Sequence, residues 1–267
     1  MSMHDALRAR IDELAAVPHL LVALDFDATV APIVARPEDA VAHPVSARAV
    51  RRLAALPDTA VAYVSGRSLD SLRQAARPPE NVLLVGSHGA EVDVPGLPTL
   101  RPLTADEETI VDALDAVLKL IASTAPGSWV EQKPYARVLH TRQADPVLGA
   151  HALRAALESV GRGLPGVVPR RGKRVVEFSI RSETKGDALR LLRARVHADA
   201  VFFAGDDTTD EDAFAVLSAA DLGVHCGDGE TRAGFTVPDP DAIAEVLDAL
   251  AAARQRRYAP VGSSVSR

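Results

Sequence analysis

The chain is poor in cysteine, in aromatic residues and in long apolar runs, and it carries no excess of positive charge. Cys226 is its one cysteine, which excludes an internal disulfide. Aromatic residues make up 4% of the chain, so Ala, Val and Leu must build most of the core. No stretch is long and apolar enough to span a bilayer. The net charge of −6 argues against general nucleic-acid binding.

The rest of the composition is typical of a globular enzyme. The 267 residues are 47% hydrophobic and 25% charged, enough for one large domain or two smaller ones. The segment Met1–Asp5 lacks the basic stretch and apolar run that begin a secretory signal. We therefore expect a cytoplasmic protein that acts without nucleic-acid or membrane partners, as a monomer or weak dimer.

Most of the chain shows an alternation of short apolar runs with helical patterns. Continuous apolar runs of this length indicate strands that are buried on both faces. We expect such strands at Leu20–Leu24, Ala60–Val64, Val82–Val85 and Ala200–Ala204, with helices at Pro44–Leu56 and Ser68–Ala76. This order predicts an α/β fold, in which a parallel sheet has helices on both faces and binds ligands beyond the carboxyl ends of its strands.

The middle of the chain has a different pattern. Thr104 and Glu107 form a capping-box pair before a helix, and Asp145-Pro146 opens a second one. Strand-like segments lie at Trp129–Lys133, Arg137–Thr141 and Arg174–Ile180. We expect an antiparallel sheet covered on one face by two helices, forming an α+β domain of residues 98–182 inserted into a core of residues 1–97 and 183–267. The polar tail from Ala253 to Arg267 is expected to fray.

Two acidic groups follow two of the expected strands. Asp25 and Asp27 come after the first, and five of the seven residues from Asp206 to Asp212 are acidic. Like charges this close repel one another, whereas a bound Mg2+ would favour them because hard cations take carboxylate oxygens. Asp206 is the best direct ligand, and Asp210 binds through water or steadies a neighbour. The acids at 210–212 also suit a helix N-terminus.

Asp25 and Asp27 lie two residues apart, so both side chains can face one pocket while Phe26 turns to the core. One Asp can act as a nucleophile and form an aspartyl-phosphate. The other can protonate the leaving oxygen and then activate water. An Asx-turn at a strand end is the ordinary alternative, but the second acidic group favours catalysis.

Lys185 stands at the start of an expected helix that Thr184 caps. A lysine there meets the positive end of the helix dipole, and Gly186 weakens the first turn. A nearby phosphate would explain both residues. The alternative, of equal weight, is an exposed lysine on a solvated turn.

Two loops at strand ends can contact a ligand. In the run Ser65-Gly66-Arg67, the Ser65 hydroxyl and the backbone N–H groups can hold phosphate oxygens, although Ser-Gly is also an ordinary turn. His88, in the loop 86–91, either contacts substrate or fixes that loop.

In the inserted region, Glu131 and Lys133 share one face of a strand, and Glu177 lies on another. Their charged groups suit sugar hydroxyls, and solvated surface is the alternative. The basic residues 170–174 fit solvated surface better. His140 and His225 have structural roles in this interpretation, and Trp129 has no assigned role.

Four of these runs resemble, in order, the motifs of the haloacid dehalogenase superfamily: residues 25–29, 65–67, 185–186 and 205–207. The longer run 205–214 is similar to that of the trehalose-6-phosphate phosphatase family, as are residues 86–91, 131–133 and 175–177. The resemblance implies a Rossmann-like core with a mobile cap inserted after the third core strand. It also implies Mg2+ and hydrolysis of a small-molecule sugar phosphate through an aspartyl-phosphate.

Position by position, the resemblance implies a role for each matching residue. Asp25 is the nucleophile, Asp27 the acid/base, and Lys185 steadies the nucleophile and the phosphoryl charge. Phosphate is bound by Thr29 and by the run of Ser65, Gly66 and Arg67. Metal is bound by Asp206, by Asp25 and by the backbone carbonyl of Asp27, with support from Asp210. The distal glucose is held by Glu131, Lys133 and Glu177.

One position departs from the family pattern. Ala28 stands where the family usually has Gly, which permits positive φ and close backbone approach. Because Ala is the smallest replacement, we expect the site to survive with altered phosphate geometry or slower turnover.

The sequence therefore predicts a Mg2+-dependent phosphatase acting on trehalose 6-phosphate or a close analogue. One alternative is a phosphatase of another disaccharide or pseudo-disaccharide phosphate, such as an aminocyclitol intermediate in antibiotic synthesis. A phosphomutase and a non-catalytic regulatory module are the others, and the presence of all the expected catalytic side chains argues against the module.

Overall fold

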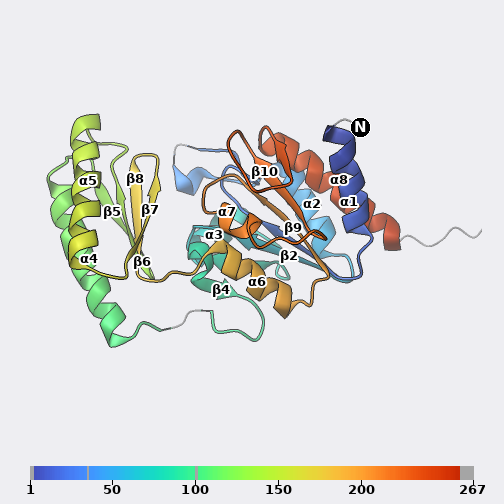
Figure 1. The fold of residues 1–267 in the computed structure, drawn as a ribbon, viewed down its shortest axis with the longest axis horizontal. Coiled ribbons are helices and arrows are strands. Elements are labelled where there is room, and N and C mark those ends of the chain that lie inside the picture. The colour runs from blue at the N-terminus through green and yellow to red at the C-terminus, as the bar shows by residue number, and fades with distance from the viewer. Residues whose placement is uncertain (1–2, 35, 100–101, 259–267) are drawn as a thin grey trace, which may run out of the picture. The chain divides into compact units, whose positions relative to one another are not determined.

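The computed structural model describes residues 3–34, 36–99 and 102–258 of the chain (Figure 1). It divides into two compact units, a larger one of Met1–Thr99 with Thr184–Arg267 and a smaller one of Leu100–Glu183. Among the described residues, no helix combines the length and the apolar character needed to cross a membrane.

A seven-stranded sheet forms the centre of the larger unit, in the order β11-β10-β9-β1-β2-β3-β4. Neighbouring strands are parallel except for β3 and β4, which are antiparallel. The strands are β1 (Leu20–Leu24), β2 (Thr59–Val64), β3 (Leu83–Gly86), β4 (Glu91–Asp93), β9 (Ala200–Gly205), β10 (Leu222–Cys226) and β11 (Phe235–Val237). The four expected strands are confirmed as β1, β2, β3 and β9, and they occupy the interior of the sheet.

Helices cover both faces of this sheet, as the continuous apolar strands predicted. Alternate residues of β1 enter two separate cores, with Leu20, Val22 and Leu24 in one and Leu21 and Ala23 in the other. The first core includes α1 (Met3–Ala15), α2 (Pro44–Ala54), α3 (Leu69–Ala76) and α8 (Pro240–Tyr258). The second includes α6 (Lys185–Arg195) and the short α7 (Glu211–Phe214). Two 3-10 turns, η1 (Pro37–Asp39) and η2 (Ser87–Gly89), complete the unit.

The C-terminal tail corrects one expectation. Helix α8 continues through Ala253 to Tyr258 instead of fraying, and residues 259–267 lie outside the described part of the chain. Arg254 explains the difference, because its buried guanidinium donates hydrogen bonds to backbone carbonyls. The acceptors include those of Ala15, Pro18 and Asp58, at 2.9, 2.8 and 2.8 Å. A charged residue that the sequence places in a polar tail therefore joins three distant segments.

The smaller unit contains a four-stranded antiparallel sheet in the order β5-β6-β8-β7. Its strands are β5 (Trp129–Lys133), β6 (Ala136–His140), β7 (Val168–Gly172) and β8 (Val175–Ser179). Helices α4 (Ala105–Ser123) and α5 (Pro146–Gly163) pack on one face (Figure 1). The capping box of Thr104 and Glu107 and the Asp145 cap are both present. The expected α+β fold of this region is confirmed, and β7 is an addition.

Candidate active site

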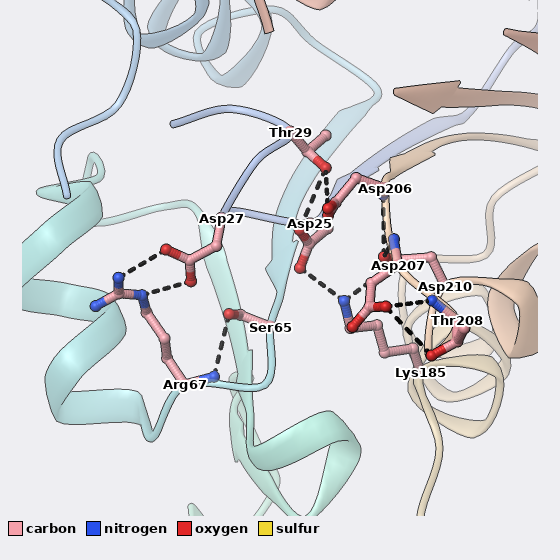
Figure 2. A network of polar contacts seen from close by, with 10 residues as sticks. All are labelled: Asp25, Asp27, Thr29, Ser65, Arg67, Lys185, Asp206, Asp207, Thr208 and Asp210. Atoms are coloured by element: carbon pink, nitrogen blue, oxygen red, sulfur yellow. Dashed lines mark hydrogen bonds and ion pairs between the residues drawn. The ribbon is translucent and has the colours of Figure 1, made fainter. Parts of the chain in front are cut away.

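The two acidic groups meet because β1 and β9 are adjacent parallel strands, with Leu24 paired to Ala204. Their carboxyl ends therefore lie together, and the Asp25 N–H donates to the Ala204 carbonyl at 2.9 Å. One carboxylate oxygen from each of Asp25, Asp206 and Asp210 lies within 4.8 Å of the other two (Figure 2). The convergence inferred from strand ends is thus present in the fold.

Lys185 lies between two of these carboxylates. Its ammonium nitrogen is 2.6 Å from Asp25 Oδ1 and 2.8 Å from Asp210 Oδ1. Thr184 caps α6 through a reciprocal capping box with Asp187. The side chain of Lys185 is 3% exposed, which rules out a solvated lysine. Two buried carboxylates compensate its unfavourable place at a helix N-terminus.

Gly186 has a packing reason of its own. A Cβ atom at this position would lie 2.4 Å from the backbone carbonyl oxygen of Asp212, in α7. No real Cβ contact is that short, so α6 and α7 approach closely only because residue 186 is glycine. A phosphate is not needed to explain this glycine, which corrects that part of the sequence argument.

Asp210 holds the acidic loop in place. Its Oδ2 accepts the backbone N–H groups of Asp206 and Asp207, at 3.1 and 3.0 Å, while its Oδ1 accepts from Lys185. Gly205 makes room for it, since a Cβ there would lie 2.3 Å from Asp210 Cγ. With both oxygens already hydrogen-bonded, Asp210 is better suited to support the neighbouring ligands than to bind metal alone.

Burial and mutual repulsion shift the acidity of this cluster. Burial raises the pKa of Asp25 well above its usual range, against the attraction of Lys185, and Asp210 and Asp206 add repulsion. Burial and then the charge of Asp210 raise the pKa of Asp206 to about 7. For Lys185, burial opposes the charged form, but Asp210 and Asp25 outweigh it and its pKa lies above the usual value. A cation bound here would relieve the repulsion, so the donor set fits a hard divalent ion.

Thr29 links the two acidic groups from the β1 side. Its hydroxyl lies 3.2 Å from Asp25 Oδ2 and 3.4 Å from Asp206 Oδ1, and the residue is fully buried. One hydroxyl proton can serve one of these oxygens at a time. Thr29 therefore lies within hydrogen-bonding reach of a carboxylate in each acidic group.

Asp27 does not join the acidic cluster through its side chain. Figure 2 shows its carboxylate turned toward Arg67, in a two-pronged ion pair with both N–O distances at 2.7 Å. Phe26 between Asp25 and Asp27 is buried in the core, as expected. The two carboxylates thus occupy different polar environments, one beside an ammonium and one beside a guanidinium.

Arg67 directs its donors to protein atoms. Besides Asp27, its guanidinium donates to the Pro37 carbonyl at 2.8 Å and to the Ser71 hydroxyl at 3.1 Å. Its side chain is 8% exposed. Ser65 is buried, and its hydroxyl accepts the Arg67 N–H at 3.2 Å. The structure therefore ties Arg67 to η1 and α3, and its expected phosphate contact stays a prediction.

His88 packs directly against the loop that contains Ser65. A Cβ on Gly66 would lie 2.6 Å from His88 Cε1, and the His88 N–H donates to the Ser65 carbonyl at 3.0 Å. His88 itself has φ of +59°. These contacts match the loop-fixing interpretation, and its substrate contact stays a prediction.

Ala28 adopts a left-handed backbone conformation, with φ of +59°, which glycine tolerates more readily than alanine. Its carbonyl accepts a hydrogen bond from the Cys226 thiol at 3.2 Å. Burial, with the nearby Asp206 charge next, raises the pKa of Cys226 to about 12, so the thiol keeps its proton and remains a donor. A strained residue therefore directly follows Asp27 in the loop after β1.

The predicted sugar-binding residues lie on the smaller sheet. Lys133 Nζ is 2.6 Å from Glu177 Oε2, and both side chains are 11% exposed. His140 Nε2 lies 2.9 Å from Glu131 Oε2. Arg170, expected from the sequence on solvated surface, lies opposite Glu177 in the sheet with a nitrogen 4.0 Å from its carboxylate. That pairing follows from strand register, which the basic run alone does not reveal.

Two glutamates hold loops of the larger unit in place through hydrogen bonds. Glu91 is buried and accepts hydrogen bonds from the Ser87 hydroxyl and from the Leu69 N–H, so it joins η2 to α3. Glu211 accepts from the Thr231 hydroxyl at 2.7 Å and the Arg232 N–H at 2.8 Å. Glu211 thus anchors a loop outside the acidic cluster.

Comparison of the sequence with known proteins identifies the family to which it is similar. The trehalose-phosphatase family model matches residues 23–235. The chain is 35% identical over 233 residues to the bifunctional trehalose-6-phosphate synthase/phosphatase of Thermoproteus tenax, covering 86% of this chain but 32% of that protein. It is 30% identical over 237 residues to the trehalose-6-phosphate phosphatase of Escherichia coli, covering 87% of each chain.

Solved structures share the fold. The C-terminal domain of Candida albicans trehalose-6-phosphate phosphatase superimposes with a TM-score of 0.81 at 22% identity, covering 92% of this chain and 96% of that one. A haloacid dehalogenase-like hydrolase from Bacteroides thetaiotaomicron gives 0.62 at 12% identity, covering 86% and 98%. The predicted Rossmann-like fold of the haloacid dehalogenase type is therefore confirmed. With its family match across residues 23–235, the chain belongs to the trehalose-phosphatase family.

Proposed function

We propose that this chain hydrolyses trehalose 6-phosphate to trehalose and phosphate. The family match and the named activity of the Escherichia coli relative support the substrate. One structural observation carries the proposal. A buried lysine lies between the carboxylates of Asp25 and Asp210, beside Asp206, where the two central strands of the sheet end.

Mg2+ is the proposed cofactor. The carboxylates of Asp25 and Asp206 and the backbone carbonyl of Asp27 would hold it, with Asp210 fixing the Asp206 loop through two backbone N–H groups. When bound, Mg2+ would offset negative charge on the phosphoryl oxygens.

The proposed chemistry has two displacements at phosphorus. In the first, a carboxylate oxygen of Asp25 bonds to phosphorus, the bond to the sugar oxygen breaks, and Asp27 donates a proton to that oxygen. In the second, water attacks the aspartyl-phosphate, Asp27 accepts its proton, and phosphate leaves with Asp25 restored. Lys185 stays close to Asp25 and offsets charge on the transferring group.

Arg67 constrains the proton transfer. In the structure it holds both carboxylate oxygens of Asp27 at 2.7 Å. For Asp27 to act as the acid, it must carry a proton and one oxygen must leave the guanidinium. We assign Arg67 as a positioning residue for Asp27. Thr29, Ser65 and Gly66 are the proposed phosphate contacts, and His88 holds the loop that contains Ser65 and Gly66.

The smaller unit is proposed as the cap that selects the sugar. Glu131, Lys133 and Glu177 would hydrogen-bond the hydroxyl groups of the distal glucose. Closing such a cap would exclude bulk water during the reaction. We also propose that the chain works in the cytoplasm, as a monomer or weak dimer.

Phosphate release tests this function. Wild type should release phosphate from trehalose 6-phosphate with Mg2+ but not with EDTA, and faster than from other phosphorylated sugars. Asp25→Asn should abolish release, while Asp70→Asn, at a side chain 91% exposed, should not change it. Faster release from another disaccharide or pseudo-disaccharide phosphate would reassign the substrate.

Two other outcomes would reassign the activity itself. A requirement for a bisphosphorylated activator with little free phosphate would indicate a phosphomutase. Tight binding of trehalose 6-phosphate without turnover in Mg2+, measured by isothermal titration, would indicate a regulatory module.

A further inference from the structure

The four-stranded sheet of the smaller unit has one face that α4 and α5 do not cover. Gln132 points to the helices, since its amide donates to Asp115 of α4 at 2.9 Å. Side chains alternate along a strand, so Trp129, Glu131 and Lys133 lie on the opposite face of β5. Cross-strand pairing places their partners on that same face, including His140 opposite Trp129.

An aromatic pair stands at one end of this open face. The rings of Trp129 and His140 are stacked, with centroids 4.0 Å apart and planes 8° from parallel. His140 is held by Glu131 at 2.9 Å, which fixes the imidazole beneath the indole. Trp129 is nevertheless 46% exposed, because the pair covers one face of the indole and leaves much of the ring at the surface.

The groups next to this indole are hydrogen-bonding and charged. Glu131 follows two residues along the strand, and the Lys133–Glu177 pair comes next, with Arg170 near Glu177. This combination of an exposed aromatic face and a row of donors and acceptors matches a pyranose ring. Such a ring presents C–H groups on its face and hydroxyl groups around its rim. A purely apolar partner would leave these charged groups without a role.

We propose that Trp129 is a sugar-stacking residue that extends the distal-glucose site of the cap. The indole would pack against the C–H face of the distal ring while Glu131, Lys133 and Glu177 bind its hydroxyls. His140 acts as a positioning residue, since it holds the indole parallel to itself and reaches the sugar only through Trp129. This inference rests on the proposed function and adds a residue that selects disaccharide over monosaccharide phosphates.

The chain offers a direct probe, because Trp129 is its one tryptophan. The intrinsic tryptophan fluorescence is therefore measured on the Asp25→Asn protein in Mg2+, where trehalose 6-phosphate should bind without turnover. We expect a saturable shift of emission and protection from acrylamide quenching with trehalose 6-phosphate, and no such protection with inorganic phosphate. Unchanged emission and quenching at saturating trehalose 6-phosphate would overturn the inference.

Kinetics separate stacking from a general movement of the cap. Trp129→Ala should raise KM for trehalose 6-phosphate roughly three- to tenfold with a smaller change in kcat, and Trp129→Phe should recover most of the loss. The ratio of kcat/KM for trehalose 6-phosphate to that for glucose 6-phosphate should fall in Trp129→Ala. The control is Leu120→Ala, on α4 of the same unit, where Leu120 is 71% exposed. This variant should keep the wild-type kcat, KM and substrate ratio.

The two proposals fail in different ways. If the emission of the Asp25→Asn protein changes while Trp129→Ala keeps the wild-type KM, that pair of results would reflect cap movement alone. It would overturn the stacking role while the phosphatase function stands. If trehalose 6-phosphate is not hydrolysed but a different disaccharide phosphate is, and its KM rises in Trp129→Ala, the substrate assignment fails and the stacking role stands.

Discussion

The ammonium group of Lys185 lies 2.6 Å from Oδ1 of Asp25, although 160 positions separate the two residues in the chain. Both residues are buried, and burying either charge without the other would be unfavourable. The lysine also reaches Asp210, so one side chain connects the end of β1 with the loop that follows β9. The candidate site depends on this connection for its charge balance and for its geometry.

Replacing Lys185 should therefore affect activity and stability together. Lys185→Met should reduce phosphate release by at least about 100-fold, because charge on the transferring group loses its partner. At pH 8 without metal it should also lower the free energy of unfolding by about 3 kcal/mol, since buried carboxylates lose their counter-charge. The loss should be smaller at pH 5 than at pH 8, because burial raises the pKa of Asp25 and so favours its neutral form as the pH falls.

Urea unfolding at the two pH values measures this effect. Lys119→Met is the matched control, since Lys119 pairs with Asp115 at the surface with 60% of its side chain exposed and should change stability by less than about 1 kcal/mol. An equal loss of stability for Lys185→Met at pH 8 and pH 5 would contradict the pairing argument.

The metal-free protein should become less stable as pH rises through neutrality. The pKa of Asp206 in the folded state is raised from 3.8 to about 7, so the folded state binds this proton more tightly than the unfolded state. Its contribution therefore destabilises the fold progressively from about pH 4 upward, and reaches full size above about pH 7. Asp206→Asn removes this penalty and should stabilise the EDTA-treated protein at pH 8, by on the order of 1–3 kcal/mol.

The comparison needs thermal melts of both proteins in EDTA at pH 5 and pH 8, repeated with Mg2+. Wild type should gain stability from Mg2+, whereas Asp206→Asn should lose most of that gain along with phosphate release. Should the variant melt below wild type at pH 8 in EDTA, the proposed charge repulsion would be wrong.

Ala28 is a strained position that glycine should relieve. Its φ of +59° disfavours any residue with a Cβ atom, by roughly 1 kcal/mol or more. Ala28→Gly should raise the free energy of unfolding by about 0.5–1 kcal/mol after the added freedom of the unfolded chain is subtracted. Ala155→Gly, at an exposed position of α5, should instead lower it by about 1 kcal/mol. Equal effects at both positions in denaturant melts would count against strain at Ala28.

Gly186 should not tolerate even one methyl group. A Cβ there would approach the Asp212 carbonyl oxygen to 2.4 Å, forcing α6 away from α7 and moving Lys185 with it. Gly186→Ala should lower the free energy of unfolding by roughly 1–3 kcal/mol and reduce kcat. In Gly161→Ala, nothing lies within 4 Å of the new Cβ on α5, so this control should be stabilised by about 0.5–1 kcal/mol. A stabilised and fully active Gly186→Ala would refute the close-approach argument.

Arg67 should act on rate more than on substrate affinity. Lysine cannot reproduce the two parallel hydrogen bonds to Asp27 or the additional contacts to Pro37 and Ser71. Arg67→Lys should therefore lower kcat about 10- to 100-fold with little change in KM, as Asp27 loses its orientation. Steady-state kinetics with trehalose 6-phosphate decide the point. A raised KM with normal kcat would instead support the phosphate-binding role inferred from the sequence.

The residues by themselves predicted the interior of the sheet and the ends of its strands. Short continuous apolar runs such as Leu20–Leu24 become strands buried on both faces. Side chains alternate between the two faces of a sheet, so a run of this kind presents apolar groups on each face. Caps such as Thr104 and Asp145 were equally readable, since they act on backbone groups within a few residues. The acidic groups after β1 and β9 could be placed together because parallel strands end at the same edge.

Other features were decided by segments that meet only in the folded chain. Strands β4, β7 and β11 lack a continuous apolar run, so local pattern does not reveal them. The pairing of Asp27 with Arg67, the burial of Arg254 and the stacking of Trp129 on His140 each depend on register or on a distant partner. Sequence pattern reports whether a residue is to be buried and how its own backbone bends, whereas its partner is chosen by packing across the whole fold.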